Sequence, residues 1–245
     1  MKVVIINQAR MTSTRLPGKV LKKVLDKPLL EYQIERLQRV KLADELVIAT
    51  TKNTTDDPIV EVCHRAGVKF YRGSEEDVLA RYYEVAKENE ADIIVRVTSD
   101  CPLIDPKIVD RVIQAYFHHQ PQCHYASNSL ERTYPRGMDT EVFSFESLDQ
   151  AYSEAVAQPD REHVTPFLIQ QPERFNLIPV LNWENQSYHR WTVDTQEDFN
   201  LIKKILEVIY PQNPEFSIAD CLNVLQEYPE WQKINAHIEQ KKYGE

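Results

Sequence analysis

The stretch Val3–Lys19 reads VVIINQARMTSTRLPGK and combines two signals. Its first part, Val3–Asn7, is a short and mostly apolar run that predicts a strand. The loop that follows holds three cations and three hydroxyl side chains within Arg10–Lys19. In open α/β sheets, ligands bind beyond the carboxyl ends of the strands. A cation-rich loop directly after the first strand therefore predicts an α/β protein with an anionic ligand.

The alternation of strand and helix continues toward the middle of the chain. Apolar runs predict strands and amphipathic stretches predict helices. The predicted strands are 45–50, 68–71 and 92–98, and the predicted helices are 28–41, 57–65, 77–89 and 105–118. Asp57 and Asp105 each precede a proline and are expected to cap their helices. This rhythm predicts a mostly parallel sheet with helices on both faces.

From residue 124 the rhythm becomes irregular, and we expect this part to extend the sheet. The elements predicted there are strands at 140–145, 175–180 and 189–193 and closing helices at 196–209 and 218–227. No internal repeat or clear interdomain linker interrupts the chain. We therefore predict a single domain over 1–245, with a nucleotide-binding part at about 1–122, an acceptor and dimer lobe at about 123–193, and closing helices over 194–245.

Composition excludes several classes of protein. With 245 residues, 42% apolar and 27% charged, the chain is long enough for a sizeable core and is not of a disordered type. The net charge of −9 argues against a general nucleic-acid binder. The four cysteines are widely spaced without a CxxC pair, which predicts reduced thiols rather than a zinc site. No apolar run approaches the roughly 20 residues of a membrane helix, so we expect a cytoplasmic protein without a membrane partner.

The loop after the first strand suits a triphosphate. Arg10 and Arg15 offer planar forks and Lys19 a compact charge for closely spaced phosphate oxygens. Gly18 is the only glycine of the loop, so it is neither a P-loop nor a GxGxxG turn. A solvated surface loop is the alternative, and the position after the first strand of a parallel sheet favours phosphate binding over it.

At this loop the chain resembles a known family. Gln8-Ala9-Arg10 followed by Ser13–Lys19 is similar to the signature of CMP-sugar synthetases, especially those that activate 3-deoxy-manno-octulosonate, and above all to SpsF-like cytidylyltransferases of spore-coat polysaccharide biosynthesis. The resemblance covers about residues 1–209. It implies a nucleotide-diphosphosugar transferase (GT-A-like) fold, CTP as donor and a homodimer. The nucleotide-binding residues that it implies in this loop are Gln8, Ala9, Arg10, Ser13, Arg15 and Lys19, with the three cations on the phosphates as catalytic residues.

Asp100 stands at the end of a predicted strand without an obvious structural reason. Pro102 keeps Cys101 extended, so no helix starts directly after Asp100 that its side chain would cap. A carboxylate in this position is well placed to hold a cation. For this aspartate alone a structural role remains an equal alternative, and the resemblance makes Asp100 a catalytic, Mg²⁺-binding residue.

Asp194 lies between a predicted strand and a predicted helix. Thr195 and Asp198 have the spacing of a capping box, which accounts for both of them. The stretch Val193–Asp198 resembles a segment of CMP-sugar synthetases in which the aspartate helps to bind metal. The resemblance therefore implies Asp194 as the second Mg²⁺ ligand, and Mg²⁺ as the cofactor.

Further site residues are weaker predictions. Ser74 and Arg81 follow the third predicted strand. Ser74 and Asp77 have the spacing of a capping box, which is a structural alternative, and the resemblance implies that this stretch lies near the base. Thr98 stands where related enzymes often carry a base-reading glutamine, which leaves the choice of cytosine less secure. For a small anionic acceptor, the candidates lie beside predicted turns and strand ends. They are Arg136, Asp139, Glu162, His163 and Arg190. An exposed arginine in a hairpin is an equal alternative for Arg136, and the resemblance implies that the Glu162-His163 pair lies near the sugar acid.

Together these residues predict an enzyme that moves CMP from CTP to an acidic sugar or related acid and releases pyrophosphate, for surface or spore polysaccharide biosynthesis. A GT-A-type glycosyltransferase that consumes a nucleotide sugar is the alternative. Asp100-Cys101-Pro102 lacks the second acid of the Asp-x-Asp motif expected of it. A non-catalytic nucleotide-binding module is a third possibility, against which the two aspartates and three loop cations speak.

Overall fold

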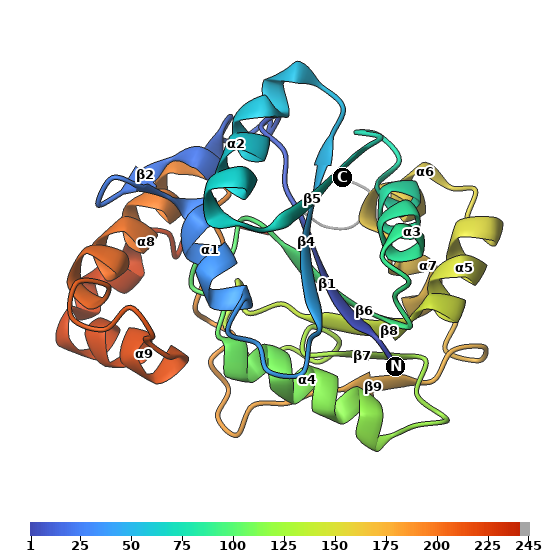
Figure 1. Cartoon of the computed structure of the whole chain (residues 1–245). Helices are drawn as coiled ribbons and strands as arrows, with labels where there is room; N and C mark the ends of the chain where they lie inside the picture. The colour runs from blue at the N-terminus through green and yellow to red at the C-terminus, as the bar shows by residue number, and fades with distance from the viewer. Residues whose placement is uncertain (241–245) are drawn as a thin grey trace.

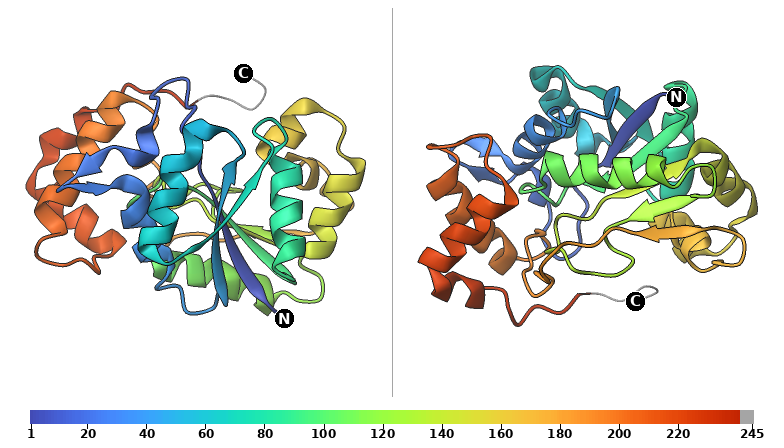
Figure 2. Two further views of the ribbon diagram at one scale, coloured as in Figure 1. Left: turned by 45° about the horizontal axis from the view of Figure 1, so that its top comes forward. Right: turned by 90° about the horizontal axis from the view of Figure 1, so that it is seen from below.

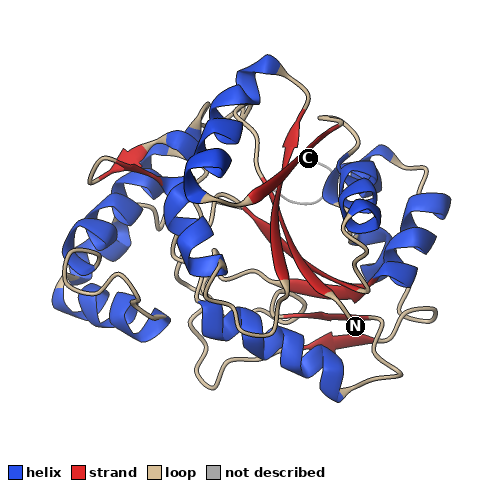
Figure 3. Cartoon of the chain, in the orientation of Figure 1, coloured by secondary structure: helices blue, strands red, loops and turns tan. Residues whose placement is uncertain are grey.

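A computed structural model, which describes residues 1–240, shows a seven-stranded sheet flanked by helices (Figures 1 and 3). The strand order is β5-β4-β1-β6-β8-β7-β9, and β8 alone runs antiparallel to its neighbours in this sheet. The strands are β1 (Val3–Gln8), β4 (Glu45–Thr51), β5 (Lys69–Gly73), β6 (Ile93–Thr98), β7 (Tyr125–Ser127), β8 (Glu141–Ser144) and β9 (Leu177–Pro179). The predicted fold class, a mostly parallel sheet between helices, is confirmed.

Helices cover both faces because each strand is apolar on both sides. Along β1, Val3 and Ile5 enter one core cluster and Val4 and Ile6 another. The first cluster lies beneath α1, α2 and α4, and the second beneath α3, α5 and α7. The bounds are α1 (Leu29–Leu37), α2 (Asp57–Ala66), α3 (Val78–Glu88), α4 (Pro106–His118), α5 (Phe145–Glu154), α6 (Gln158–His163) and α7 (Pro166–Ile169). In Figure 1 these two groups of helices stand on opposite sides of the central strands.

A third core cluster builds a lobe at one side of the sheet (Figure 2). It contains α8 (Gln196–Ile209), α9 (Ile218–Glu227) and the short hairpin of β2 (Lys23–Val24) and β3 (Lys27–Pro28). The 3-10 turns η1 (Lys19–Leu21), η2 (Thr54–Asp56) and η3 (Pro229–Lys233) complete the elements. In this lobe, the early hairpin of β2 and β3 and the late helices α8 and α9 meet near the carboxyl end of β6. Within the described part of the chain, no helix is both long and apolar enough to cross a membrane.

Several predicted elements match the structure closely. The helices predicted at 196–209 and 218–227 are α8 and α9, and Asp105 caps α4 by accepting a hydrogen bond from the Lys107 N–H at 2.9 Å. The division into three parts is not tested by the fold, and residues 241–245 of the predicted closing part lie outside the described residues. The four cysteines are buried and free.

The strand predicted at 189–193 is wrong. The segment makes only an isolated bridge between Arg136 and Arg190. Its alternating pattern reflects burial of Trp191 and Val193 in the third core cluster, not a strand ladder. β7 was absent from the prediction, because a strand of three residues gives too little periodicity to detect. The ten-residue helix α5 was also missed.

Asp57 does not cap α2, as the sequence predicted, but is its first residue. The preceding Asp56 stands at the cap position, yet its fully buried carboxylate caps no N–H of the helix. It accepts hydrogen bonds from the Met11 N–H at 2.8 Å and from Thr50 and Thr51. Asp56 therefore ties the loop after β1 to the end of β4.

Arg36 of α1 joins the sheet to the helical lobe. Its buried guanidinium donates to the carbonyls of Ile104 at 2.6 Å and Phe216 at 2.9 Å and stacks on the Phe216 ring. Burial lowers the pKa of Arg36 to about 10, so the side chain stays charged at neutral pH. Arg36 thus ties the lobe to the sheet through two hydrogen bonds, in addition to the packing of the third core cluster.

We predict that Arg36→Met lowers the free energy of unfolding by about 3 kcal/mol, because two buried carbonyls lose their donor. Arg39→Met is the matched control, since Arg39 bonds the Pro214 carbonyl at an exposed position and its loss should cost less than about 1 kcal/mol. Urea denaturation followed by circular dichroism measures both. Equal losses in the two variants would show that Arg36 does not join the lobe to the sheet.

Candidate active site

The loop after β1 ends in a tight turn that presents Lys19. Gly18 adopts a left-handed conformation with φ of 68°, which suits glycine, and its N–H donates to the Met11 carbonyl at 2.9 Å. The chain then enters η1, whose first residue is Lys19. Anchored by Asp56 at one end and closed by Gly18 at the other, the loop holds its cations in a defined position.

Lys19 lies between the two aspartates that were predicted to bind metal. Its ammonium is 2.9 Å from Asp100 Oδ2 and 2.8 Å from Asp194 Oδ1. Arg15 reaches the same oxygen of Asp194 at 3.0 Å. Asp100 follows β6 and Asp194 precedes α8, and the two segments are joined by a hydrogen bond from the Val193 N–H to the Asp100 carbonyl at 2.8 Å. The fold therefore brings together residues that are far apart in the sequence.

The charges of this cluster stabilise one another. Burial alone would raise the pKa of Asp100, but the Lys19 ammonium and a hydrogen bond from the Thr98 hydroxyl outweigh it and lower the pKa to about 2. Burial likewise opposes the charge on Lys19, yet both carboxylates raise its pKa above the ordinary value. Because the pKa of Asp100 is lowered, its contribution to stability is present at neutral pH and is lost as the pH falls through about 2.

Asp194 is oriented from behind by Arg190. The Arg190 guanidinium donates to Asp194 Oδ2 at 2.9 Å and to both oxygens of the fully buried Asp198. Asp198 also accepts from the N–H groups of Asp194 and Thr195, both at 3.0 Å. Thr195 and Asp198 form the predicted capping box. Asp194 Oδ1 is thereby left to face Lys19 and Arg15.

Arg190 was predicted to contact the acceptor, and this contact stays a prediction. In the structure its guanidinium holds Asp194 and Asp198. It is only 7% exposed, and its guanidinium nitrogens are bound to Asp194, Asp198 and Gln240. The prediction missed this because Asp198 was explained by helix capping alone, and a buried arginine partner has no signature in sequence spacing.

A divalent cation fits the pair of carboxylates. Asp100 and Asp194 already converge on one cation, the Lys19 ammonium. Within residues 1–240, no group of three or more His, Cys, Asp or Glu side chains is placed to hold a metal ion. Two carboxylates, with the remaining ligands supplied by phosphate oxygens and water, are the usual protein share of a Mg²⁺ site in nucleotide enzymes. Such an ion would compete with Lys19 for the same oxygens.

The predicted nucleotide side lies around Arg10. Its guanidinium is 3.8 Å from Glu75, in the loop between β5 and α3, and is partly exposed. Ser74 stands in the same loop, while Arg81 is buried and donates to the Ser74 carbonyl at 2.7 Å. Arg81 therefore shapes the loop from below, and its contact with a nucleotide stays a prediction.

The remaining loop residues support the fold locally. Ala9 is buried and its N–H donates to the Ala49 carbonyl at 3.0 Å, while the Ser13 hydroxyl accepts from the Leu16 N–H at 3.4 Å. Gln8 accepts a hydrogen bond from Arg96 at 3.3 Å. None of these contacts tests their predicted role in nucleotide binding.

Arg96 and Glu141 form a buried ion pair that the sequence analysis missed. They face each other in the antiparallel register of β6 and β8, and Arg96 also contacts Gln8. His163, at the end of α6, is subject to the electrostatic field of Arg96 and of Arg10. Partial burial lowers the pKa of His163, and Arg96 and Arg10 lower it further against the opposing charge of Glu162. His163 is thus electrostatically coupled to the nucleotide side, although its contact with an acceptor is untested, as is that of the exposed Glu162.

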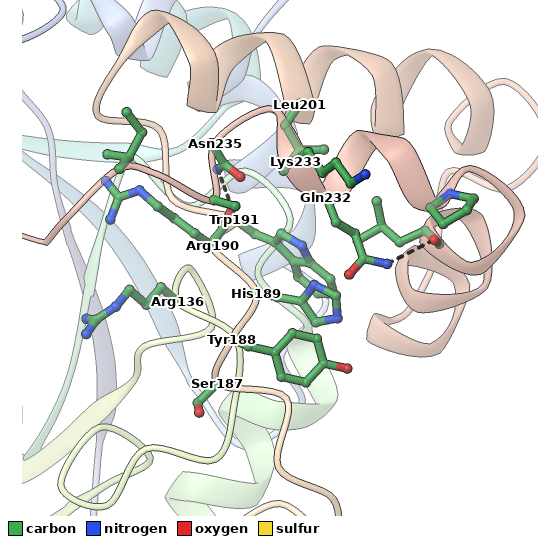
Figure 4. A pocket seen from close by; sticks show the side chains of 14 residues that line it. Arg136, Ser187, Tyr188, His189, Arg190, Trp191, Leu201, Gln232, Lys233 and Asn235 are labelled. Atoms are coloured by element: carbon green, nitrogen blue, oxygen red, sulfur yellow. Dashed lines mark hydrogen bonds between the residues drawn. The ribbon is translucent and has the colours of Figure 1, made fainter.

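Arg136 is brought beside Arg190 by a close backbone approach. Its N–H donates to the His189 carbonyl at 3.1 Å, and its carbonyl accepts from the Trp191 N–H at 2.8 Å. Gly137 makes this possible, because a Cβ there would lie 2.7 Å from the Trp191 backbone and its φ is 102°. Figure 4 shows the Arg136 and Arg190 side chains extending to the same side from neighbouring segments.

The Arg136 guanidinium has no hydrogen bond or ion pair within the described part of the chain. Burial and the neighbouring charge of Arg132 lower the pKa of Arg136, while Asp139 opposes them. Asp139 accepts two hydrogen bonds from Arg132, at 2.6 and 3.0 Å, and its predicted contact with the substrate stays a prediction. Arg161 is similarly occupied by Asp77. An unpaired, half-buried guanidinium is a suitable receptor for an anion.

Known nucleotidyltransferases share this fold. A solved structure of CMP:2-keto-3-deoxy-manno-octonic acid synthetase in complex with CTP shares it with a TM-score of 0.65, at 20% identity over 84% of this chain and 98% of that one. The chain itself belongs to the cytidylyltransferase family, which it matches over residues 3–241. The resemblance seen in the loop after β1 is thereby confirmed.

Two relatives are similar over nearly their whole length. The structure of a cytidylyltransferase from Leptospira borgpetersenii has a TM-score of 0.91 and 36% identity, covering 99% of this chain and 100% of that one. The spore coat polysaccharide biosynthesis protein SpsF of Bacillus subtilis is 33% identical, covering 93% of this chain and 95% of the relative.

We predict that Lys19→Met destabilises the protein by roughly 3 kcal/mol, because it leaves two partly buried carboxylates facing each other. Added Mg²⁺ should raise the melting temperature of this variant more than that of the wild type, in which Lys19 competes for the same oxygens. The exposed Lys23→Met is the control and should behave like the wild type. Thermal denaturation with and without Mg²⁺ measures the effect. An equal Mg²⁺ response of wild type and Lys19→Met would contradict a shared cation site.

Proposed function

We propose that the protein transfers CMP from CTP to an acidic sugar or related small acid, with release of pyrophosphate. The observation that carries this proposal is the convergence of Asp100 and Asp194 on one cation beside Arg15. Membership of the cytidylyltransferase family supports CTP as the donor. The synthetase named above and SpsF support a sugar acid as acceptor and polysaccharide biosynthesis as the pathway.

The donor side would bind the triphosphate of CTP. Arg15 and Lys19 lie at the two aspartates, and Arg10 stands at the partly exposed end of the same loop. Their positive charges would hold the β- and γ-phosphates and stabilise the charge that develops on pyrophosphate. Mg²⁺ held by Asp100 and Asp194 would supply further neutralisation of the phosphate oxygens.

The reaction itself needs no covalent protein intermediate. A bond forms between the acceptor oxygen and the α-phosphorus, and the bond from that phosphorus to the bridging oxygen breaks. The electron pair leaves on pyrophosphate, where the loop cations lie, and the acceptor hydroxyl gives its proton to solvent water. The contribution of this chain is to align the acceptor oxygen with the leaving group and to neutralise charge.

The acceptor side would use Arg136. Its guanidinium is unpaired within the described residues and lies beside Arg190, which holds Asp194. A carboxylate bound there by two parallel hydrogen bonds would be fixed in orientation. In a chain of net charge −9, such local positive charge also attracts an anionic acceptor. His163, coupled to Arg10 and Arg96, is a second proposed contact.

The glycosyltransferase alternative is less well supported. Cys101 separates Asp100 from Pro102, so the second acid of an Asp-x-Asp motif is missing. A nucleotide-sugar donor also makes less use of three loop cations, because it carries a diphosphate rather than a triphosphate.

Release of pyrophosphate distinguishes a cytidylyltransferase from a glycosyltransferase. The purified protein, incubated with each of the four ribonucleoside triphosphates and a panel of acidic and neutral sugars, should release pyrophosphate with CTP and an acidic sugar. Transfer of a sugar from a nucleotide sugar would overturn the proposal.

We predict that Asp100→Asn retains the fold but lowers turnover by about a thousandfold, since a nearly isosteric amide binds Mg²⁺ poorly and several kcal/mol of charge stabilisation are lost. Asp149→Asn is the matched control, because Asp149 is an exposed residue of α5 that lies outside the charge cluster. Steady-state pyrophosphate release at saturating CTP measures both. Near-normal turnover of Asp100→Asn at ordinary Mg²⁺ would refute the metal assignment.

We predict that Arg136→Ala raises the KM for the acceptor by roughly 10- to 100-fold, as expected for the loss of charge-assisted hydrogen bonds, and leaves CTP affinity nearly unchanged. Arg136→Lys should give an intermediate value, because it keeps the charge but not the planar fork. Kinetics with varied acceptor and calorimetry with CTP separate the two substrates. A silent Arg136→Ala, together with a neutral sugar used as well as the acidic one, would exclude this acceptor site.

A further inference from the structure

The polar network behind Asp194 continues into the C-terminal segment. Asn235 is only 3% exposed, and its side-chain amide donates to the Arg190 carbonyl and to Asp198 Oδ1, each at 2.8 Å. Figure 4 shows the Asn235 side chain beside the Arg190 backbone. Further along, the Gln240 side-chain oxygen accepts a hydrogen bond from Arg190 Nη1 at 2.6 Å. Two residues of one segment thus contact the arginine that orients Asp194.

This segment, residues 234–240, has no regular secondary structure and follows η3. Between it and residues 187–191 lies a cavity of about 570 Å³, whose walls include His189, Gln232 and Asn235. Ile234, the first residue of the segment, packs against the third core cluster. From there on, the segment contacts Arg190 through the polar side chains of Asn235 and Gln240.

We propose that Asn235 and Gln240 are positioning residues for the metal-binding aspartate Asp194. The inference rests on the proposed function, because it concerns the cation site of that reaction. Neither residue touches Asp194. Asn235 holds Asp198 and the backbone of Arg190, Gln240 holds the Arg190 side chain, and Arg190 in turn fixes Asp194 Oδ2. Through these contacts the C-terminal segment helps to direct Asp194 Oδ1 toward the cation site.

The physical reason is pre-organisation of the carboxylate. The partners behind a metal ligand orient it, and their removal typically weakens metal affinity about 10- to 100-fold. Asn235 acts one hydrogen bond further away, through Asp198 and Arg190. We therefore expect Asn235→Ala to weaken cation binding by about tenfold, at the lower end of that range. Asn235→Asp should weaken it more, because a carboxylate of the same size repels Asp198.

The experiment measures cation binding without turnover. Free Mn²⁺ is followed by electron paramagnetic resonance in the full-length protein with an α,β-methylene analogue of CTP. The variants are Asn235→Ala, Asn235→Asp and Gln240→Ala, and Lys233→Ala is the matched control, since its exposed side chain lines the same cavity without a hydrogen bond to the network. Melting temperature and analogue affinity without metal are measured in parallel.

The expected result is a rise in the Mn²⁺ dissociation constant in the order wild type, Asn235→Ala, Asn235→Asp. Gln240→Ala should show a several-fold rise and unchanged analogue affinity without metal, and it carries the test if a variant at the buried Asn235 does not fold. Unchanged Mn²⁺ binding in the folded variants, or an equal loss in Lys233→Ala, would overturn this inference but leave the proposed function standing. A wild-type protein that binds no Mn²⁺ with the analogue would overturn the proposed function as well.

Discussion

The rest of the site depends on two carboxylates that cannot lie close together without a cation. Asp100 and Asp194 both contact Lys19. The attraction of the Lys19 ammonium for the two carboxylates outweighs the cost of burying these charges. Removing one partner of such a buried pair costs far more than the pair contributes in net terms. The same repulsion that makes Lys19 important for stability would, under the proposed function, favour a divalent ion between the two carboxylates.

The fold supplies this pair from two different layers. Asp100 comes from the end of a central strand, β6, and Asp194 from the entry to α8 in the helical lobe. Arg36 fastens that lobe to the sheet, and Gly137 lets the segment that ends at Asp194 approach Arg136 closely. The lobe is therefore part of the site. A change that loosens the lobe is expected to disturb the contact between Asp194 and Lys19 before it disturbs the central sheet.

Much of this architecture was predictable from the sequence, because it follows from periodicity and from residues at strand ends. The parallel strands, α4, α8 and α9, and the placement of Asp100 all come from local patterns. Side-chain pairing was not predictable. Asp198 has a sufficient local explanation as part of a capping box, so its second partner, Arg190, gave no signal, and Asn235 is a single polar residue near the end of the chain. Likewise, Trp191 and Val193 alternate as in a strand although they pack against helices.

The most direct test of the account is a crystal structure of the protein soaked with CTP and Mn²⁺, with the metal located by its anomalous scattering. The account predicts one Mn²⁺ within coordination distance of both Asp100 and Asp194 and of a phosphate oxygen of CTP. It also predicts that the Lys19 ammonium has moved from between the carboxylates to a phosphate. A CTP complex in which Lys19 still bridges Asp100 and Asp194, with the Mn²⁺ bound elsewhere, would contradict it.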